Sequence, residues 1–450
     1  MQASGAGAQP IASNEMAATT LSLSRARVLA ASSGWAGATL WVGVVIAGHL
    51  LGASLVARDR FVLISSPPLV GELDLRIDLA LVPAIVLAVA AVRWAPPLAA
   101  RLRWRVLLVA TWAAGVAWAL ALAASAGLDA IAAPLSTRYE YLAAVPSVES
   151  PGSFLTGFVG ALEGYPIHVK GHPPGMVLVL WLLDSVGLGG AQVAAALVIG
   201  VGALAAPAAL VALRAVADEG WARRAAPFVA FTPAAVWIAT SADALFSGVA
   251  ACGLALAALA LYSDARRRAL VLGLAAGIVL GGALMLSYGI VPLGAIVLVL
   301  AIARRAWRAL LAIATGVAVV AAAFALAGFW WPAGLAATRD LYFEGVASRR
   351  PYEAFLLISL AAFALAVGPA AAAGAARLRD RRVWLVVGAA LMSVAAADLS
   401  GLSRGETERI WLIFVPWIGL AAAALVHQRR WLALQLALAI ALQAGVRSPW

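Results

Sequence analysis

Long apolar runs, separated by short polar segments, make up most of the chain from Trp35 to the C-terminus. Runs of about 17 to 25 residues recur, and at 1.5 Å per residue each could cross a hydrocarbon layer of about 30 Å as a helix. Apolar residues follow one another continuously instead of alternating with polar ones, which favours helices over the strands of a membrane barrel. The pattern predicts an all-α polytopic membrane protein.

Thirteen of these runs form membrane crossings, or transmembrane helices, in the topology that we predict. They cover residues 34–56, 79–98, 105–127, 191–215, 224–240, 242–262, 269–286, 288–303, 308–330, 354–374, 383–399, 410–426 and 431–447. Thirteen crossings place on one side all the basic clusters, at 101–105, 223–224, 264–268, 304–308, 377–382 and 427–430. Because short cytoplasmic loops are rich in Lys and Arg, we expect that side to be the cytoplasm.

The count depends on a further apolar run that we do not expect to cross the membrane. "MVLVLWLLDSVGLG", residues 176–189, is apolar but carries Asp184. If this run crossed once, every later basic cluster would face outward, against the positive-inside rule. We therefore expect residues 173–190 to form a short re-entrant or membrane-surface helix.

This topology places the longest polar segments on the outer, extracytoplasmic face. These are the loops at 57–78, 128–172 and 331–353 and the turns at 240–243, 286–289 and 400–409. We expect residues 31–450 to form one transmembrane domain, with amphipathic helices in the large outer loop 128–172. Chemistry is expected on the outer face, because the predicted cytoplasmic loops are short and no phosphate-binding glycine motif opens a soluble βαβ unit.

Composition narrows the class of protein further. The chain is 64% hydrophobic and 12% charged, with a formal net charge of +11. A positive charge could indicate nucleic-acid binding, but the basic residues form small clusters between apolar runs, so we expect no nucleic-acid partner. Residues 1–30 are predicted to be a disordered cytoplasmic tail, since they are small and polar and lack the basic start of a signal peptide. The single cysteine, Cys252, excludes an intrachain disulfide.

The stretch "HVKGHPPGM", residues 168–176, gathers His168, Lys170 and His172 at the end of loop 128–172. Pro173 and Pro174 suit the first turn of a helix that begins at the outer interface, just after His172. The cations either anchor the loop to lipid headgroups or bind the phosphate of a lipid substrate at the helix start. The two histidines lack an obvious third ligand, so we expect no metal site.

Other outer segments also carry polar residues with two open interpretations. Asp243, in "TSADALFSG", either caps the next helix with the help of Ser241 or serves as an acid/base group in a protein-lined cavity. Tyr288, in "MLSYGI", either fills a turn or contacts substrate. Loop 331–353 is either a lid with an anion clamp or a solvated loop; its charged residues include Arg339, Asp340, Glu344, Arg349 and Arg350.

The stretch "SRGETERIWL", residues 403–412, places charges at the start of an apolar run. A glutamate at a helix start complements the helix dipole, whereas Arg409 opposes it. Arg409 is therefore expected to have an anionic partner. The candidates are Glu406, Asp398 and a substrate phosphate, which matches the planar guanidinium group.

These stretches resemble motifs of the GT-C superfamily of glycosyltransferases, multi-helix membrane enzymes that transfer a sugar from a polyprenyl-phosphate carrier. The chain looks most similar to the branch with protein O-mannosyltransferases and aminoarabinose transferases. The counterparts of that branch's outer-loop motifs are "TRYEYLAA" at 137–144 and "KGHPPGM" at 170–176, while "SADALF" resembles a later outer Asp motif and "SRGETERIWL" a late basic motif. The likeness covers about residues 105–290 and 395–420. Relatives usually carry an acidic residue just before the Arg-Tyr pair, and this chain has "PLST" there, at 134–137.

The resemblance implies a cell-membrane enzyme without a cofactor, which moves a mannose- or arabinose-like sugar from polyprenyl phosphate to an extracytoplasmic hydroxyl with inversion. The acceptor would be a glycan, a glycolipid or a protein. Glu140 and Asp243 are the expected catalytic carboxylates, with Asp129 and Glu163 as substitutes. The expected substrate-binding residues are Arg138, Tyr139, His168, Lys170, His172, Tyr288, Arg404, Glu406 and Arg409. The alternative is a transporter or flippase of a lipid-linked or amphipathic substrate, a class that tends to carry charges in mid-helix and internal repeats.

Overall fold

The computed structural model describes residues 11–58, 62–239 and 241–448, and 79% of it is helical. The α-helices are α1 (Ile11–Val56), α2 (Val82–Arg101), α3 (Trp104–Ala123), α4 (Pro151–Gly157), α5 (Ile167–Lys170), α6 (Gly175–Ser185), α7 (Ala191–Gly202), α8 (Ala205–Val216), α9 (Glu219–Ala230), α10 (Asp243–Leu261), α11 (Arg266–Leu284), α12 (Gly294–Arg304), α13 (Trp307–Leu326), α14 (Trp331–Glu344), α15 (Tyr352–Val367), α16 (Pro369–Arg377), α17 (Arg381–Ser400), α18 (Thr407–Ile410), α19 (Val415–Gly419) and α20 (Gln428–Gly445). The all-α prediction is confirmed.

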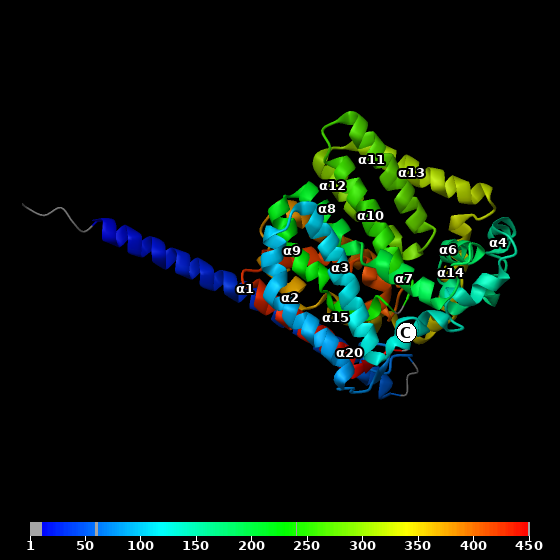
Figure 1. Cartoon of the computed structure of the whole chain (residues 1–450), viewed down its shortest axis with the longest axis horizontal. Coiled ribbons are helices and arrows are strands. Elements are labelled where there is room, and N and C mark those ends of the chain that lie inside the picture. Colours follow the sequence, from blue (N-terminus) through cyan, green and yellow to red (C-terminus); the bar gives the residue numbers. More distant parts are fainter. Residues whose placement is uncertain (1–10, 59–61, 240, 449–450) are drawn as a thin grey trace, which may run out of the picture.

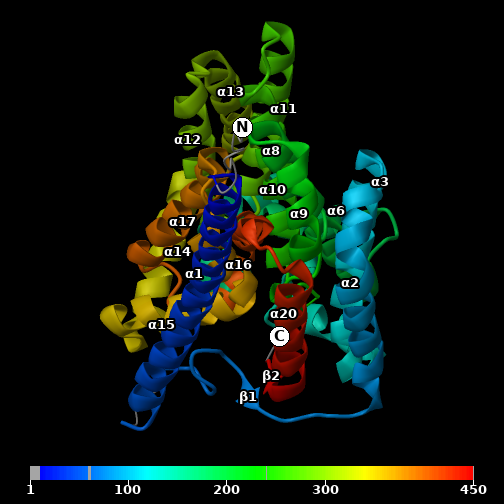
Figure 2. The ribbon, with the colours of Figure 1, turned by 90° about the vertical axis from the view of Figure 1, so that its left-hand side faces the viewer.

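Short 3-10 helices and one small sheet complete the described secondary structure. The 3-10 helices are η1 (Leu79–Leu81), η2 (Ala124–Ala126), η3 (Leu128–Ile131), η4 (Ala133–Ser136), η5 (Tyr141–Ser147), η6 (Leu162–Gly164), η7 (Pro233–Trp237), η8 (Tyr288–Leu293), η9 (Val346–Arg349), η10 (Trp411–Ile413) and η11 (Leu420–Ala424). The two-residue strands β1 (Glu72–Leu73) and β2 (Val446–Arg447) pair antiparallel below α20 in Figure 2. Loop 128–172 is therefore a chain of short 3-10 and α-helices.

Eight helices in the described residues are long and apolar enough to cross a membrane, or up to ten if each of two bent helix pairs counts as one span. The protein thus has the helices of a polytopic membrane protein, and the number thirteen stays a prediction. Run 224–240 contains only the second part of α9, which ends at Ala230, and the 3-10 helix η7. Run 410–426 is broken into η10, α19 and η11, and its two halves meet at an angle of 78°.

The apolar run at 176–189, which we did not count as a membrane crossing, forms most of α6, a helix of eleven residues. At 1.5 Å per residue it is about 16 Å long, roughly half the hydrocarbon thickness. It packs against η5, and α7, which follows it, begins beside η4. The chain therefore enters and leaves α6 beside loop 128–172. Whether this helix is re-entrant or lies on the membrane surface stays a prediction.

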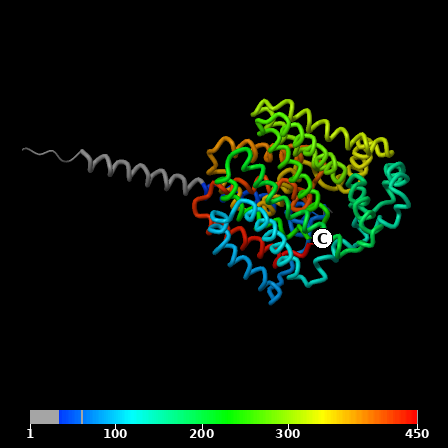
Figure 3. Tube along the Cα trace, turned by 45° about the horizontal axis from the view of Figure 1, so that its top comes forward, coloured from blue at the N-terminus to red at the C-terminus, as the bar shows by residue number. Residues whose placement is uncertain are grey.

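Small residues let several helices approach closely. Figures 1 and 3 show α11 and α13 side by side at one edge of the bundle. Gly273, Gly277 and Gly281 recur on α11 at every fourth position, and a Cβ at Gly277 would lie 2.1 Å from the carbonyl oxygen of Ile313 on α13. On another side α1 packs on α15 and α16, as Figure 2 shows. Close backbone approach of this kind is typical of helix packing in membranes.

The segments that the sequence assigned to the outer face contact one another at one end of the bundle. Contacts join Val70 with Glu408, Lys170 with Thr338, Gly175 with Met285, Asp243 with Arg409, and Leu63 with Arg350. Segments at or beside four of the basic clusters form a second group of contacts, through Arg223 with Leu102, Arg224 with Leu425, Arg377 with Ala424, and Arg382 with Asp218. The other two clusters contact each other through Arg304 and Asp264. This grouping is what two opposite faces require, and which of them is cytoplasmic stays a prediction.

The domain prediction concerns residues that the structure describes only in part. Residues 1–10 of the predicted disordered tail lie outside the described residues, and α1 begins at Ile11. Disorder of the tail therefore stays a prediction. From Gly34 onward the helices enclose a core made largely of Ala, Val, Leu and Phe.

Candidate functional site

Six of the residues singled out from the sequence form one cluster where loop 128–172 meets the ends of α10 and α18. We call them the polar cluster: Glu140, His168, His172, Asp243, Glu406 and Arg409. Glu140 directly precedes η5, the two histidines lie on and just after α5, and Asp243 is the first residue of α10. Glu406 and Arg409 come from the sharp turn into α18. Four segments far apart in sequence therefore build this site.

An ion-pair chain runs through the centre of the polar cluster. Arg409 donates from NH1 to Oδ2 of Asp243 at 2.7 Å and from NH2 to Oε2 of Glu406 at 3.1 Å. Asp243 and Arg409 are each 4% exposed, so this pair is shielded from water. Ser241 also donates from its hydroxyl to Oδ2 of Asp243, at 2.9 Å. Asp243 is thus held in place, and the helix position before it, Ala242, is the N-cap.

A second pair joins Glu140 and His168. Nδ1 of His168 lies 2.7 Å from Oε1 of Glu140, and the backbone N–H of His168 donates to the carbonyl of Tyr139. Glu140 is 2% exposed, and its Oε2 has no hydrogen-bond partner among the described residues. A buried carboxylate oxygen without a partner is costly unless a proton or a ligand reaches it. Glu140 therefore has the free acceptor that a general base needs.

His172 lies between the two pairs. Its Nδ1 is 2.8 Å from the carbonyl oxygen of His168, which can only accept, so Nδ1 carries the proton. Burial lowers the pKa of His172, with the nearby charge of Arg409 acting in the same direction and Asp243 opposing it. The neutral ring then presents the lone pair of Nε2 to Oδ1 of Asp243, 3.8 Å away. Two acceptors that face each other can hold a hydroxyl or ammonium donor between them.

Aromatic side chains form the apolar wall of the site. The ring of Tyr141 lies 5.8 Å from that of His172 and 6.2 Å from that of Phe246, and Phe246 is 5.3 Å from His172. Burial, helped by the carboxylates of Asp243 and Glu140, raises the pKa of the Tyr141 hydroxyl well above its ordinary value. Tyr141 therefore stays protonated in the buried part of the site.

Arg350 supports the turn that carries Glu406. It is 3% exposed and donates to the carbonyls of Val62, Leu63 and Arg404, and its NH2 lies 3.5 Å from Oε1 of Glu406. Burial opposes ionisation of Glu406, but Arg409 and Arg350 outweigh it and hold its pKa below the ordinary value. A charged Glu406 between two guanidinium groups leaves Arg409 aligned toward Asp243.

The remaining predicted residues lie outside the polar cluster. Arg138 and Tyr139 are exposed and stack on each other, with the guanidinium carbon 4.9 Å from the ring centre. Lys170 contributes its backbone carbonyl to the hydroxyl of Thr338. Tyr288 packs on Trp331 at 5.1 Å, and Arg404 donates to the carbonyls of Ala347 and Arg350. Asp129 and Glu163, the substitute carboxylates, are exposed and are not in the cluster.

These contacts test the predictions made for Arg409, Asp398 and Asp243. The expectation that Arg409 has an anionic partner is confirmed, with Asp243 and Glu406 as the partners. Asp398 takes part in none of the ion pairs found among the described residues. Asp243 does not occupy the N-cap, which decides against that interpretation of it.

Sequence reasoning did not place Tyr141 in the site, nor Arg350 at its support. Tyr141 directly follows Glu140 and shares the "RYEY" stretch, so its position was the available signal. Arg350 was one of several charges in loop 331–353, and nothing in the sequence separates it from its exposed neighbour Arg349. Only the fold shows which of the two is buried.

Metal-ligand types are present at the site, but no group of three or more His, Cys, Asp and Glu side chains in the described ranges is arranged to hold a metal ion. The cluster instead pairs each carboxylate with a nitrogen cation or imidazole. Groups of these kinds can accept protons and stabilise charge.

No protein-family model matches this chain, and no curated protein is significantly similar to it. The likeness to GT-C glycosyltransferases rests on the short motifs alone. Two of those motifs, "TRYEYLAA" and "KGHPPGM", supply Glu140 and His172, and the other two supply Asp243 and Arg409. Four motifs that lie apart in the sequence thus contribute to one cluster.

Proposed function

We propose that the protein is a membrane glycosyltransferase that moves a sugar from a polyprenyl-phosphate carrier to an acceptor hydroxyl on the outer face of the membrane, with inversion. The observation that supports this most is the meeting of Glu140, His172, Asp243 and Arg409 in one largely buried cluster at the ends of apolar helices. Such a site has an acceptor for a proton and fixed positive charge for a phosphate.

Glu140 is the base in this proposal. Its unpartnered Oε2 takes the proton from the acceptor hydroxyl, whose oxygen then forms a bond to the anomeric carbon. The bond from that carbon to the phosphate oxygen breaks at the same time, and polyprenyl phosphate leaves with the electron pair. His168 orients Glu140 through the 2.7 Å contact. Attack from the face opposite the leaving group inverts the configuration.

Arg409 and its partners stabilise the phosphate that leaves. A phosphate needs no proton on departure, but its charge requires compensation in a site that excludes water. Asp243 is occupied by Arg409 and Ser241, so its role here is to hold the guanidinium group in place. Of the two carboxylates expected to be catalytic, Glu140 therefore becomes the base and Asp243 a positioning residue.

The test is a transfer assay in nanodiscs with a panel of radiolabelled polyprenyl-phosphate sugars. Glu140→Gln should lower turnover by a factor on the order of 100 to 10,000, because the amide cannot accept the proton. Glu163→Gln is the matched control, since it changes an exposed glutamate in the same loop. Turnover by Glu140→Gln at the wild-type rate would exclude Glu140 as the base.

Transport of a lipid-linked substrate is the alternative outcome of the same preparation. In vesicles, a flippase would move the labelled lipid between leaflets without forming a transfer product. The charges of the cluster lie at helix ends and in loops rather than at mid-helix, which favours the transferase.

A further inference from the structure

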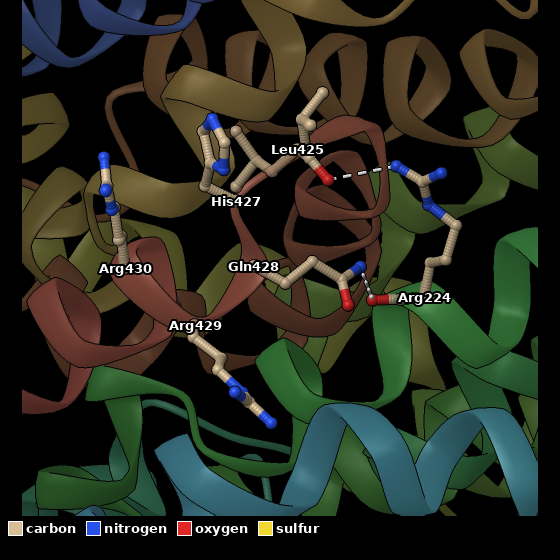
Figure 4. A pocket seen from close by; sticks show the side chains of 7 residues that line it. Arg224, Leu425, His427, Gln428, Arg429 and Arg430 are labelled. Carbon is tan, nitrogen blue, oxygen red and sulfur yellow. Dashed lines mark hydrogen bonds between the residues drawn. The ribbon is translucent and has the colours of Figure 1, made fainter.

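A cavity lined by arginines lies at the end of the bundle where the basic clusters meet, away from the polar cluster. Its volume is about 530 Å³. The residues that line it are Arg224, Leu425, Val426, His427, Gln428, Arg429 and Arg430. Figure 4 shows that Arg224 extends toward the carbonyl of Leu425, whereas Arg429 and Arg430 extend from α20 in other directions. The cavity lies between the middle of α9 and the start of α20.

Arginines at this cavity are not neutralised as others at the same end are. Arg382 pairs with Asp218 and Asp380, and Arg223 pairs with Glu219. Among the ion pairs of the described residues, by contrast, none includes Arg224, Arg377, Arg429 or Arg430. No carboxylate lines the cavity. Positive charge is therefore concentrated there without a protein counterion.

Backbone carbonyls of residues 423–425 hold the guanidinium groups of Arg224 and Arg377 near each other. Arg224 donates to the carbonyls of Ala423 and Leu425, and Arg377 donates to the carbonyl between them, that of Ala424. Arg429 donates to the carbonyl of Arg93. The like charges repel, and an anion in the cavity would relieve that repulsion.

Tryptophans beside the cavity mark the level of the membrane interface. Trp35 is 60% exposed and lies 4.9 Å, centre to centre, from Trp431, the residue after Arg430. Trp94 is 55% exposed and follows Arg93. Exposed tryptophans prefer the boundary between headgroups and hydrocarbon. A lipid phosphate would lie at that same depth.

We propose that this cavity binds the phosphate of an anionic membrane lipid. Guanidinium groups match phosphate oxygens in geometry and charge, and the exposed Val426 leaves an apolar edge for the start of the lipid chains. The site is separate from the polar cluster and does not depend on the proposed reaction.

Native mass spectrometry of the whole protein in detergent tests this proposal, with phosphatidylglycerol, phosphatidylcholine and inorganic phosphate as probes. Wild-type protein should bind phosphatidylglycerol more tightly than phosphatidylcholine, whose choline cation the arginines repel. Arg429→Gln with Arg430→Gln should weaken phosphatidylglycerol binding about tenfold or more. The corresponding double lysine variant should fall between the two, because it keeps the charge but loses the planar fork.

Arg267→Gln with Arg268→Gln is the matched control, since it removes the same charge from exposed positions in another basic cluster. It should bind phosphatidylglycerol as the wild type does. Equal binding of the two lipids by wild type, or an equal loss in the control, would overturn the proposal. Inorganic phosphate that binds as tightly as phosphatidylglycerol would overturn the lipid as the source of the phosphate.

Discussion

At the scale of single residues, the pair between Asp243 and Arg409 is a short, buried contact in the polar cluster. Both side chains are buried, and they lie 2.7 Å apart. Removal of one member leaves the other as an uncompensated buried charge, whereas removal of both does not.

Asp243→Asn is therefore expected to destabilise the protein by about 3 kcal/mol, and Asp243→Asn combined with Arg409→Gln by clearly less. Thermal unfolding in detergent measures this difference. The double variant should regain stability but not transfer activity, because no guanidinium group remains for the phosphate. Arg409→Gln alone completes the comparison. If the double variant loses as much stability as the two single variants together, Asp243 and Arg409 are not coupled as their geometry indicates.

His172 makes stability depend on pH. Its pKa is lowered in the folded protein, so between that value and the ordinary value of about 6.5 the unfolded chain binds more protons. Stability is then unaffected by His172 above about pH 6.5 and falls as the pH drops through this window.

We expect His172→Gln to reduce the loss of unfolding temperature between pH 7 and pH 5.5. Gln can still donate to the carbonyl of His168 but cannot take up a proton. His427→Gln, at an exposed position, is the control. An unchanged slope in His172→Gln would show that other groups cause the acid sensitivity.

At the scale of elements, the turn into α18 decides whether the charges meet. Gly405 has φ of +82°, and a Cβ there would lie 3.1 Å from NH1 of Arg350. Glu406 follows with φ of +61°. This backbone course brings Glu406 and Arg409 to the same side of the turn.

Gly405→Ala should destabilise the protein by about 1 to 2 kcal/mol and reduce activity, because alanine strains a left-handed backbone and displaces Arg350. Gly152→Ala, in the exposed start of α4 with no atom within 4 Å of the added Cβ, is the control and should be tolerated. Unfolding temperature and turnover are the measurements. A tolerated Gly405→Ala would mean that the turn can relax without loss of the site.

Helix content could be predicted from the sequence, but breaks within helices could not. Continuous apolar runs correctly predicted the helices α3, α10 and α17, in which nothing interrupts the backbone. Run 410–426 is just as apolar, yet it folds as η10, α19 and η11. A straight helix and a bent segment both bury apolar side chains, so apolar character alone cannot distinguish between them.

The members of the site could be named more readily than their roles. Charges in an otherwise apolar chain indicated Asp243 and Arg409, and the resemblance to GT-C glycosyltransferases indicated Glu140. Their division of labour depends on distances, since Asp243 is occupied by Arg409 while Glu140 keeps one free oxygen. Such distances arise from packing between segments more than 100 residues apart, which no local pattern records.

At the scale of the whole molecule, two sets of loops gather at two ends. If the polar cluster faces outward, a cysteine at Glu163 should react with a membrane-impermeant maleimide in intact cells, and a cysteine at Arg267 should react only after lysis. Cys252→Ser provides the background. Both test positions are exposed, so access differs only by side of the membrane. Reversed labelling would mean that the orientation is opposite to the one predicted. Equal labelling of both positions in intact cells would contradict their placement on opposite sides of the membrane.

The distance along the chain between Asp243 and Arg409 also affects how the protein is made. Arg409 is 166 residues later than Asp243. At 5 to 20 residues per second, the ribosome completes it roughly 10 to 30 seconds after the aspartate. During that interval α10 enters the membrane with a carboxylate that has no guanidinium partner. The cost of an unpaired buried carboxylate favours a nascent chain that keeps this end of α10 at the aqueous boundary until Arg409 is made, and a chain cut short before α18 would keep Asp243 without this partner.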